Sequence, residues 1–200
     1  FFTKGSGYSG ELDVRSRKAR VRQSLAIAPF YLFLRFALSV YLPIVNGFML
    51  HSSSIARGGR GFLFSGMPES GKSTVAKLSS EFIILCDDFS IVRKLGSSFY
   101  AFGSPFWGRV EARGENIRNC AGNIPVRGIY FLCKNLDVHL EEIGRMEAIS
   151  RLVQNMALLA DSADVNNRLL RLSDEFIGSV SHGILHFKRD NTFWRCIENA

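Results

Sequence analysis

The segment most suggestive of chemistry is a glycine-rich loop at residues 66–73. It fits the pattern G-x-x-x-x-G-K-[ST], in which successive backbone N–H groups hold phosphates. Lys72 would neutralise charge on the β- and γ-phosphates, and the Ser73 hydroxyl would bind Mg²⁺. The alternative is a chance match in a turn. The pattern predicts a bound nucleoside triphosphate, held by Gly66, Met67, Pro68, Glu69, Ser70, Gly71, Lys72, Ser73 and Thr74.

A pair of carboxylates follows this loop in the sequence. Residues 82–86 form a continuous apolar run, typical of a strand buried on both faces, and Asp87 and Asp88 come directly after it. Two acids at the end of such a strand suit Mg²⁺ coordination and the activation of an attacking hydroxyl. The alternative is an exposed acidic strand end.

The segments around the loop have the pattern of the elements that would position it. An apolar run at residues 61–65 precedes the loop, and a helix-compatible stretch at 74–79 follows it. This is the strand–loop–helix context that the motif requires. An extended stretch at 47–56 and a turn at 57–60 come before the first strand. We therefore predict a hairpin that leads into the loop.

Residues 25–50 are apolar enough to raise the question of a membrane span. Arg35 and Pro43 interrupt the run, and each is costly or disruptive in hydrocarbon. A stripe of apolar residues at four-residue spacing consists of Phe30, Leu34 and Leu38. The spacing predicts a helix buried on most of its surface and ended by Pro43, and it argues against a membrane span.

Composition and charge set the remaining expectations. The 200 residues are 46% hydrophobic and 22% charged, which suits one globular core. The formal net charge of +7 would favour an acidic partner, but five cations crowd into residues 15–22 with no aromatic residue among them. We expect a solvated charged face or a flexible lead-in there, and no nucleic-acid binding. The four cysteines have no metal-ligand spacing, so we expect neither zinc nor disulfides and a cytoplasmic location.

Several of these residues together resemble a known family. His51, the glycine-rich loop and residues 86–91 match, in order and spacing, the catalytic domain of bacterial HPr kinase/phosphorylase and its shorter relatives. Those proteins share a nucleotide-binding core with phosphoenolpyruvate carboxykinases. Residues 110–114 resemble the E-x-R-G segment of the family, and weaker matches extend the resemblance over roughly residues 30–200.

The resemblance implies a role for each matching residue. Asp88 would take the proton from a substrate hydroxyl, and Asp87 would be a metal or second-shell ligand. His51 would lie near the transferred phosphoryl group and orient the acid pair or the substrate. Glu111 would be a second metal or substrate ligand, and Arg113 would stabilise charge in the transition state. Surface salt bridges are the alternative for Glu111 and Arg113.

The expected fold is α/β, with a basic lead-in over residues 1–24 and one domain over 25–200. The domain would have a mixed, largely buried β-sheet flanked by helices, of the HPr kinase or phosphoenolpyruvate carboxykinase type. With ATP and Mg²⁺, it would act as a kinase that transfers the γ-phosphoryl group to a hydroxyl. The acceptor would be a serine of a peptide or protein, or a small metabolite. The sequence leaves open whether the chain forms a homo-oligomer.

The alternative function is a catalytically weak or inactive nucleotide-binding module that organises a partner protein. Glu69 favours this alternative, because the family commonly has a second glycine at that point. A positive φ angle would be strained in a glutamate, whose side chain we expect to turn outward.

Overall fold

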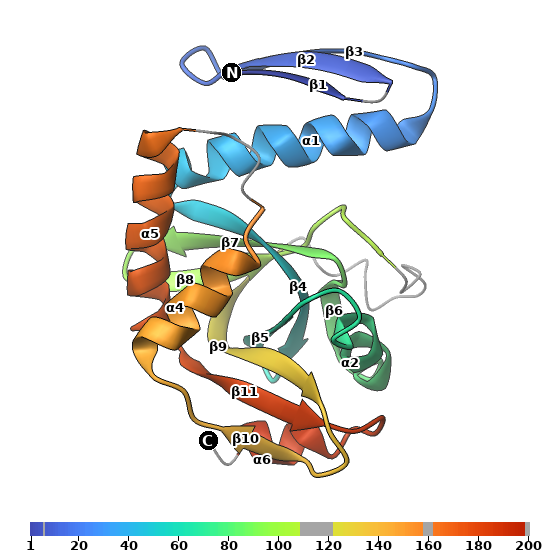
Figure 1. Cartoon of the computed structure of the whole chain (residues 1–200), viewed down its shortest axis with the longest axis vertical. Coiled ribbons are helices and arrows are strands. Elements are labelled where there is room, and N and C mark those ends of the chain that lie inside the picture. The colour runs from blue at the N-terminus through green and yellow to red at the C-terminus, as the bar shows by residue number, and fades with distance from the viewer. Residues whose placement is uncertain (6, 109–121, 158–161, 199–200) are drawn as a thin grey trace.

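The structure is a computed structural model, and it describes residues 1–5, 7–108, 122–157 and 162–198 (Figure 1). These residues form a mixed α/β fold around an eight-stranded sheet with the order β10-β11-β9-β5-β4-β7-β8, in which β6 pairs with β4. The elements are β1 (Phe2–Gly5), β2 (Tyr8–Asp13), β3 (Lys18–Gln23), α1 (Ile27–Tyr41), η1 (Leu42–Val45), β4 (Gly47–Arg57), β5 (Arg60–Ser65), α2 (Lys72–Leu78), β6 (Ile83–Cys86), β7 (Phe89–Leu95), β8 (Ser98–Phe102), β9 (Asn123–Lys134), β10 (His139–Glu141), α4 (Arg145–Gln154), α5 (Ala163–Ile177), β11 (Ser181–Phe187) and α6 (Phe193–Glu198).

The central strand β9 connects most of the sheet. Its first residues pair antiparallel with β8, and its later residues pair in parallel with β5 and β11. The parallel register sets Ser65 opposite Phe131 and Phe187 opposite Lys134, so β5, β9 and β11 end at the same edge. The predicted hairpin is β4 and β5, joined by a turn at Gly58 and Gly59, both with positive φ. It delivers the chain to the glycine-rich loop at that edge.

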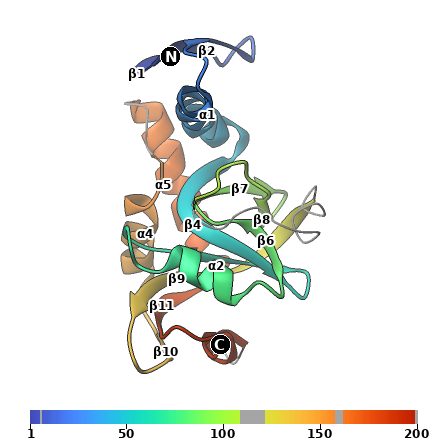
Figure 2. The same cartoon turned by 90° about the vertical axis from the view of Figure 1, so that its right-hand side faces the viewer.

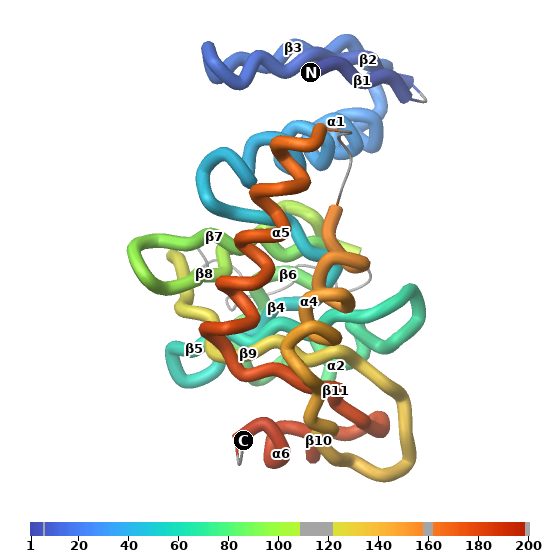
Figure 3. Tube along the Cα trace, turned by 60° about the vertical axis from the view of Figure 1, so that its left-hand side comes forward, coloured from blue at the N-terminus to red at the C-terminus, as the bar shows by residue number. Residues whose placement is uncertain are grey.

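Helices cover both faces of the sheet, as the expectation of a largely buried sheet requires. Helices α4 and α5 lie side by side against one face, where Leu63 is fully buried (Figure 1, Figure 3). Helices α2 and α6 cover the other face, where Phe64 packs against Trp194. Leu63 and Phe64 are neighbours in β5, and their opposite directions follow from the two-residue period of a strand.

Residues 2–23, expected as a charged lead-in, form a three-stranded antiparallel sheet in the order β1-β2-β3. This small sheet lies on α1, away from the large sheet (Figure 1, Figure 2). Its cations are exposed, as a solvated charged face would have them, and these are Arg15, Arg17, Lys18, Arg20 and Arg22. On the other side, Leu12 packs with Phe33 and Phe36 of α1. The segment is therefore an ordered layer with one polar and one apolar side.

The predicted helix is present, and it is packed on two sides. It ends at Tyr41, and a 3-10 turn that contains Pro43 follows. Phe33 and Phe36 face the small sheet, whereas Leu34 and Leu38 pack toward the large one. Within the described residues, Ile27–Val45 is the stretch long and apolar enough to cross a membrane, with a mean hydropathy of 1.6. The core helix of a soluble protein meets the same criterion, but less than half of this stretch is buried and Phe30 of the predicted stripe is exposed, so the prediction that α1 is buried on most of its surface is wrong.

Candidate functional site

The glycine-rich loop connects the end of β5 to the start of α2, so the predicted strand–loop–helix order is present. Gly71 has a φ of 110°, and a Cβ atom there would lie 2.5 Å from Cζ of Phe187. Only glycine meets both conditions, because other residues rarely adopt this backbone conformation and have no room for the methyl carbon. The loop is thereby held against the end of β11.

Glu69 has the positive φ expected of it, at 66°. Holding a glutamate in this left-handed conformation costs on the order of 1 kcal/mol. Its side chain is exposed, so its carboxylate turns outward as expected. The neighbouring Ser70 hydroxyl is buried and has no hydrogen-bond partner within the described residues. The loop therefore holds both a strained backbone position and an unsatisfied donor, which ligand sites often combine.

Lys72 points back into the loop. Its side chain is 7% exposed, and Nζ donates hydrogen bonds to the carbonyl oxygens of Gly66 at 2.8 Å and Met67 at 3.0 Å. Burial lowers the pKa of Lys72, and the negative charge of Asp88 opposes this effect. Among the residues that the structure describes, the ammonium group thus has neutral carbonyl groups as its hydrogen-bond partners. Phosphate oxygens would be stronger partners for it.

The two adjacent acids have different surroundings. Asp87 is 2% exposed, and its Oδ1 accepts a hydrogen bond from the Gly108 N–H at 2.7 Å. Asp88 lies on the side of His51, whose Nε2 is 3.3 Å from Asp88 Oδ1. The fold therefore separates the pair into a buried acid with a main-chain partner and a part-exposed acid beside a histidine. The assignment of Asp88 as the base and Asp87 as a metal ligand or supporting group stays a prediction.

His51 is fixed by its position in β4. It pairs in register with Phe89 of β7, and the two rings stack with centroids 5.1 Å apart. Its carbonyl oxygen accepts a hydrogen bond from the Ser65 hydroxyl at 3.0 Å, directly before the glycine-rich loop. The structure thus brings His51, Asp88 and the start of the loop together.

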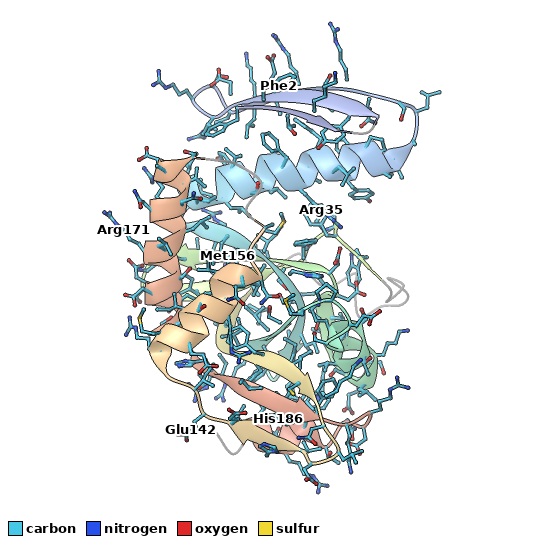
Figure 4. All side chains as sticks on the ribbon, in the orientation of Figure 1. Phe2, Arg35, Glu142, Met156, Arg171 and His186 are labelled. Carbon is cyan, nitrogen blue, oxygen red and sulfur yellow. The ribbon has the colours of Figure 1, made fainter. Side chains whose placement is uncertain are left out.

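Arg35 of α1 is part of the same site, which sequence reasoning missed. Its Nη2 donates to Asp88 Oδ2 at 2.7 Å, and its guanidinium lies 4.5 Å from the centroid of the Phe89 ring and 5.4 Å from that of Phe106. Figure 4 shows Arg35 on the side of α1 that faces the large sheet. Its Nε is buried without a hydrogen-bond partner in the described part of the chain. A charge within an apolar helix was the available signal, because such a residue needs a partner.

Not all predicted site residues can be placed. Glu111 and Arg113 lie outside the described residues. Ser73 and Thr74 lie in the first turn of α2 and are partly exposed. Across the described ranges, no group of three or more His, Cys, Asp or Glu side chains could hold a metal ion. A Mg²⁺ ion at Ser73 and Asp87 would need phosphate oxygens and water to complete its shell, as this ion commonly has them.

A family model described as "SynChlorMet cassette protein ScmC" matches residues 34–180, well over half of the chain. The chain belongs to the ScmC family. The range that matches the ScmC model includes Arg35, His51, the glycine-rich loop and both acids. No curated protein matches the sequence.

Among solved structures, this ScmC-family chain is similar to the Hpr(Ser) kinase/phosphatase from Coxiella burnetii. The identity is 17% and the TM-score 0.33, with 48% of this chain and 72% of that chain covered. At this level of similarity, the activity of the ScmC-family chain has to be inferred from its own residues.

Proposed function

We propose that this ScmC-family protein is an ATP-dependent kinase that transfers the γ-phosphoryl group to a hydroxyl. The acceptor is a serine of a peptide or protein, or a small metabolite. The observation that carries the proposal is the position of Asp88, which is paired with His51 and acts electrostatically on the buried ammonium of Lys72. A carboxylate beside a cationic loop suits hydroxyl activation next to a bound triphosphate.

Binding of the triphosphate is supported by the groups that the loop leaves poorly partnered. The Lys72 ammonium would exchange its carbonyl partners for phosphate oxygens, and the buried Ser70 hydroxyl would gain an acceptor. The first change replaces hydrogen bonds from an ammonium group to neutral carbonyls by bonds between two charged groups, and the second supplies a bond that is missing. The Ser73 hydroxyl and Asp87 would hold Mg²⁺ with phosphate oxygens, and Glu111 is a further candidate ligand. This ion would neutralise charge on the β- and γ-phosphates.

In the proposed reaction, the acceptor oxygen attacks the γ-phosphorus and forms the new P–O bond. The bond from the γ-phosphorus to the oxygen bridging it to the β-phosphate breaks, and ADP leaves with that electron pair. The hydroxyl proton passes to the Asp88 carboxylate, which His51 orients through the 3.3 Å contact. Lys72 offsets the charge that develops on the phosphates, because phosphoryl transfer depends mainly on positioning and electrostatics. Arg113 would add to this effect.

A second candidate function is a nucleotide-binding module without transfer chemistry. It is favoured by one observation, which is that both Asp88 oxygens have partners, Oδ2 in Arg35 and Oδ1 in His51. A carboxylate whose two oxygens both have partners leaves less room for the hydroxyl of an incoming acceptor. In this case, bound nucleotide would organise a partner protein.

Incubation with ATP labelled at the γ-phosphate separates the two candidates. The experiment compares wild type with Asp88→Asn and with the control Asp164→Asn, which changes an exposed acid on α5. Each protein is incubated with Mg²⁺ and with serine peptides, free serine or water as the acceptor. We expect transfer or hydrolysis by wild type and the control, and a loss of about 10²- to 10⁴-fold in Asp88→Asn with ATP binding retained. Tight ATP binding by wild type without any transfer or hydrolysis would support the module instead.

A further inference from the structure

A cavity of about 440 Å³ lies next to the glycine-rich loop, and the transfer chemistry above does not use it. We call it the Phe187 pocket. Its lining residues are Thr74, Lys134, Asn135, Leu136, Phe187, Lys188 and Arg189. The volume lies within the range of roughly 300–1,000 Å³ that is common for small-molecule sites.

The sheet topology sets the Phe187 pocket beside the loop. Its walls come from the residues at the ends of β9 and β11, whose last residues, Lys134 and Phe187, are parallel partners. The N–H of Asn135 donates to the Phe187 carbonyl oxygen at 3.0 Å and joins the two strand ends. Strand β5 runs parallel to β9 and ends at the same edge, where the glycine-rich loop begins. Ligands of α/β sheets bind outside the carboxyl ends of such strands.

The pocket and the loop also share a wall. The Phe187 ring lies so close to Gly71 that a Cβ atom there would be 2.5 Å from Cζ. Thr74, in the first turn of α2, lines the pocket from the other side. A ligand with phosphates in the loop would therefore have its remaining part next to this pocket.

A hydrogen-bonded turn at Asn135 holds the apolar side chain of Leu136 at the pocket. Asn135 Oδ1 accepts hydrogen bonds from the N–H groups of Leu136, at 2.7 Å, and Asp137, at 3.4 Å. The turn holds Leu136 out of the protein interior with 87% of its surface exposed. Leu136 thus offers exposed apolar surface on a preformed frame, beside a Phe187 ring that is itself 2% exposed, and this surface suits a flat, weakly polar ring.

The rim of the pocket is cationic. Lys134 and Arg189 are exposed and have no ion pair within the described residues, whereas Lys188 pairs with Asp190 at 3.2 Å. Two cations without a carboxylate partner in this described part of the chain favour a ligand with negative charge. Apolar surface between cations fits the base, ribose and first phosphate of a nucleotide better than it fits a sugar or a lipid tail.

We propose that the Phe187 pocket binds the base and ribose of the nucleotide whose β- and γ-phosphates lie in the glycine-rich loop. This inference rests on the proposed function, because it assigns the second half of the same ligand. It makes Leu136 a specificity-determining residue that distinguishes a nucleotide from a bare polyphosphate.

Isothermal titration with two ligands tests the proposal. Wild type, Leu136→Ser and Leu170→Ser are titrated with ATP and with inorganic tripolyphosphate, each with Mg²⁺. Leu170 is a matched control, since it is an exposed leucine of α5. We expect ATP to bind about tenfold more weakly to Leu136→Ser, because apolar contact with the base is lost. Tripolyphosphate should bind both variants as it binds wild type, and Leu170→Ser should bind ATP normally.

Saturation-transfer NMR, compared at equal occupancy, reports which protons of the ligand contact the protein. The adenine protons of ATP should receive saturation from the wild-type protein and receive less from Leu136→Ser at equal occupancy. Unchanged ATP affinity and unchanged saturation transfer in Leu136→Ser would overturn the pocket assignment and leave the loop assignment standing. Failure of wild type to bind either ligand would overturn the proposed function and the pocket assignment together.

Discussion

The pKa of Lys72 depends on a balance between the burial of its ammonium group and the hydrogen bonds that this group donates. Lys72 is a buried residue, so its ammonium group loses part of its hydration, and two carbonyl oxygens replace only some of what is lost. This imbalance lowers the pKa of Lys72, and it makes an anionic ligand the natural partner for the loop. The same side chain would hold the loop together before the ligand binds.

Lys72→Ala should abolish nucleotide binding. The substitution removes the charge that offsets the β- and γ-phosphates and the hydrogen bonds that hold Gly66 and Met67 in place. Lys77→Ala is the control, because Lys77 is an exposed lysine of the same helix. Titration with ATP should give micromolar binding in the control and no measurable binding in Lys72→Ala. Micromolar affinity in Lys72→Ala would refute the assignment of the loop.

Cys86 should resist alkylation in the folded protein. The thiol is fully buried, and desolvation raises its pKa to about 12, so almost no thiolate exists at pH 8. Cys133 is partly exposed and should react with iodoacetamide first. Peptide mapping by mass spectrometry after a timed reaction, with and without urea, measures both sites. Equal labelling of the two thiols without urea would show that the strand end at Cys86 opens readily.

At the residue scale, the sequence predicted the parts of the site that a local pattern encodes. The glycine-rich loop and the acids after β6 are contiguous motifs, so spacing was enough to find them. Arg35 is 53 residues from Asp88 along the chain. No local pattern could pair the two, because their contact exists only after α1 has packed over the sheet. The charge of Arg35 within an apolar run indicated that this residue has a partner, but it did not identify the partner.

At the element scale, α1 brings a charged group to a site formed otherwise by strands and one loop. The Arg35 guanidinium lies between two aromatic rings and an acid, which fixes its direction. Both members of the Arg35–Asp88 pair have side chains less than a third exposed. The pair therefore links the position of α1 to the position of the Asp88 carboxylate, the candidate base.

Removing Arg35 should destabilise the protein measurably. Arg35→Met leaves Asp88 without its guanidinium partner and forfeits the contacts with Phe89 and Phe106, so we expect a loss of about 1–3 kcal/mol in the free energy of unfolding. Urea denaturation of Arg35→Met, Asp88→Asn and the double variant gives the coupling energy of the pair. Arg20→Met is the control, because Arg20 and Glu11 form an exposed pair that should contribute little. Additive effects of the two site substitutions would contradict a stabilising pair.

Elements differ in how well their sequences predict them. The sequence predicts the β4–β5 hairpin from its turn, the strand before the acids from its continuous apolar run and α1 from its helical spacing, and all three are present. The small N-terminal sheet was not predicted, because charged side chains on its outer face hide the alternation of β2 and β3. Its identity as a sheet depends on α1, which supplies the apolar surface that a three-stranded sheet of this size lacks. Tertiary packing, rather than local propensity, decides this element.

At the scale of the whole molecule, α1 forms a layer between two sheets. Figure 2 shows α1 between the small sheet and the large one. The small sheet packs on Phe33 and Phe36 of α1, and the large sheet packs toward Leu34 and Leu38. More than half of the net positive charge lies in residues 1–24, and the cations of residues 15–22 there are exposed. The N-terminal layer therefore supplies both the cover of an apolar helix and much of the charge that keeps copies of the chain apart.

Removal of residues 1–24 should make the chain self-associate. The truncation exposes Phe33, Phe36 and Val40 on a helix that is apolar on its other side as well, and it lowers the net charge that opposes contact between copies. Light scattering and analytical ultracentrifugation should report larger species for the truncated chain than for the full chain at equal concentration. A truncated chain with Phe33→Ser and Phe36→Ser is the matched control. It should have the same oligomeric state as the full chain. If the truncated chain without these substitutions had the same oligomeric state as the full chain, the small sheet would not be needed to cover α1. The apolar contacts around Leu12 would then contribute little to solubility.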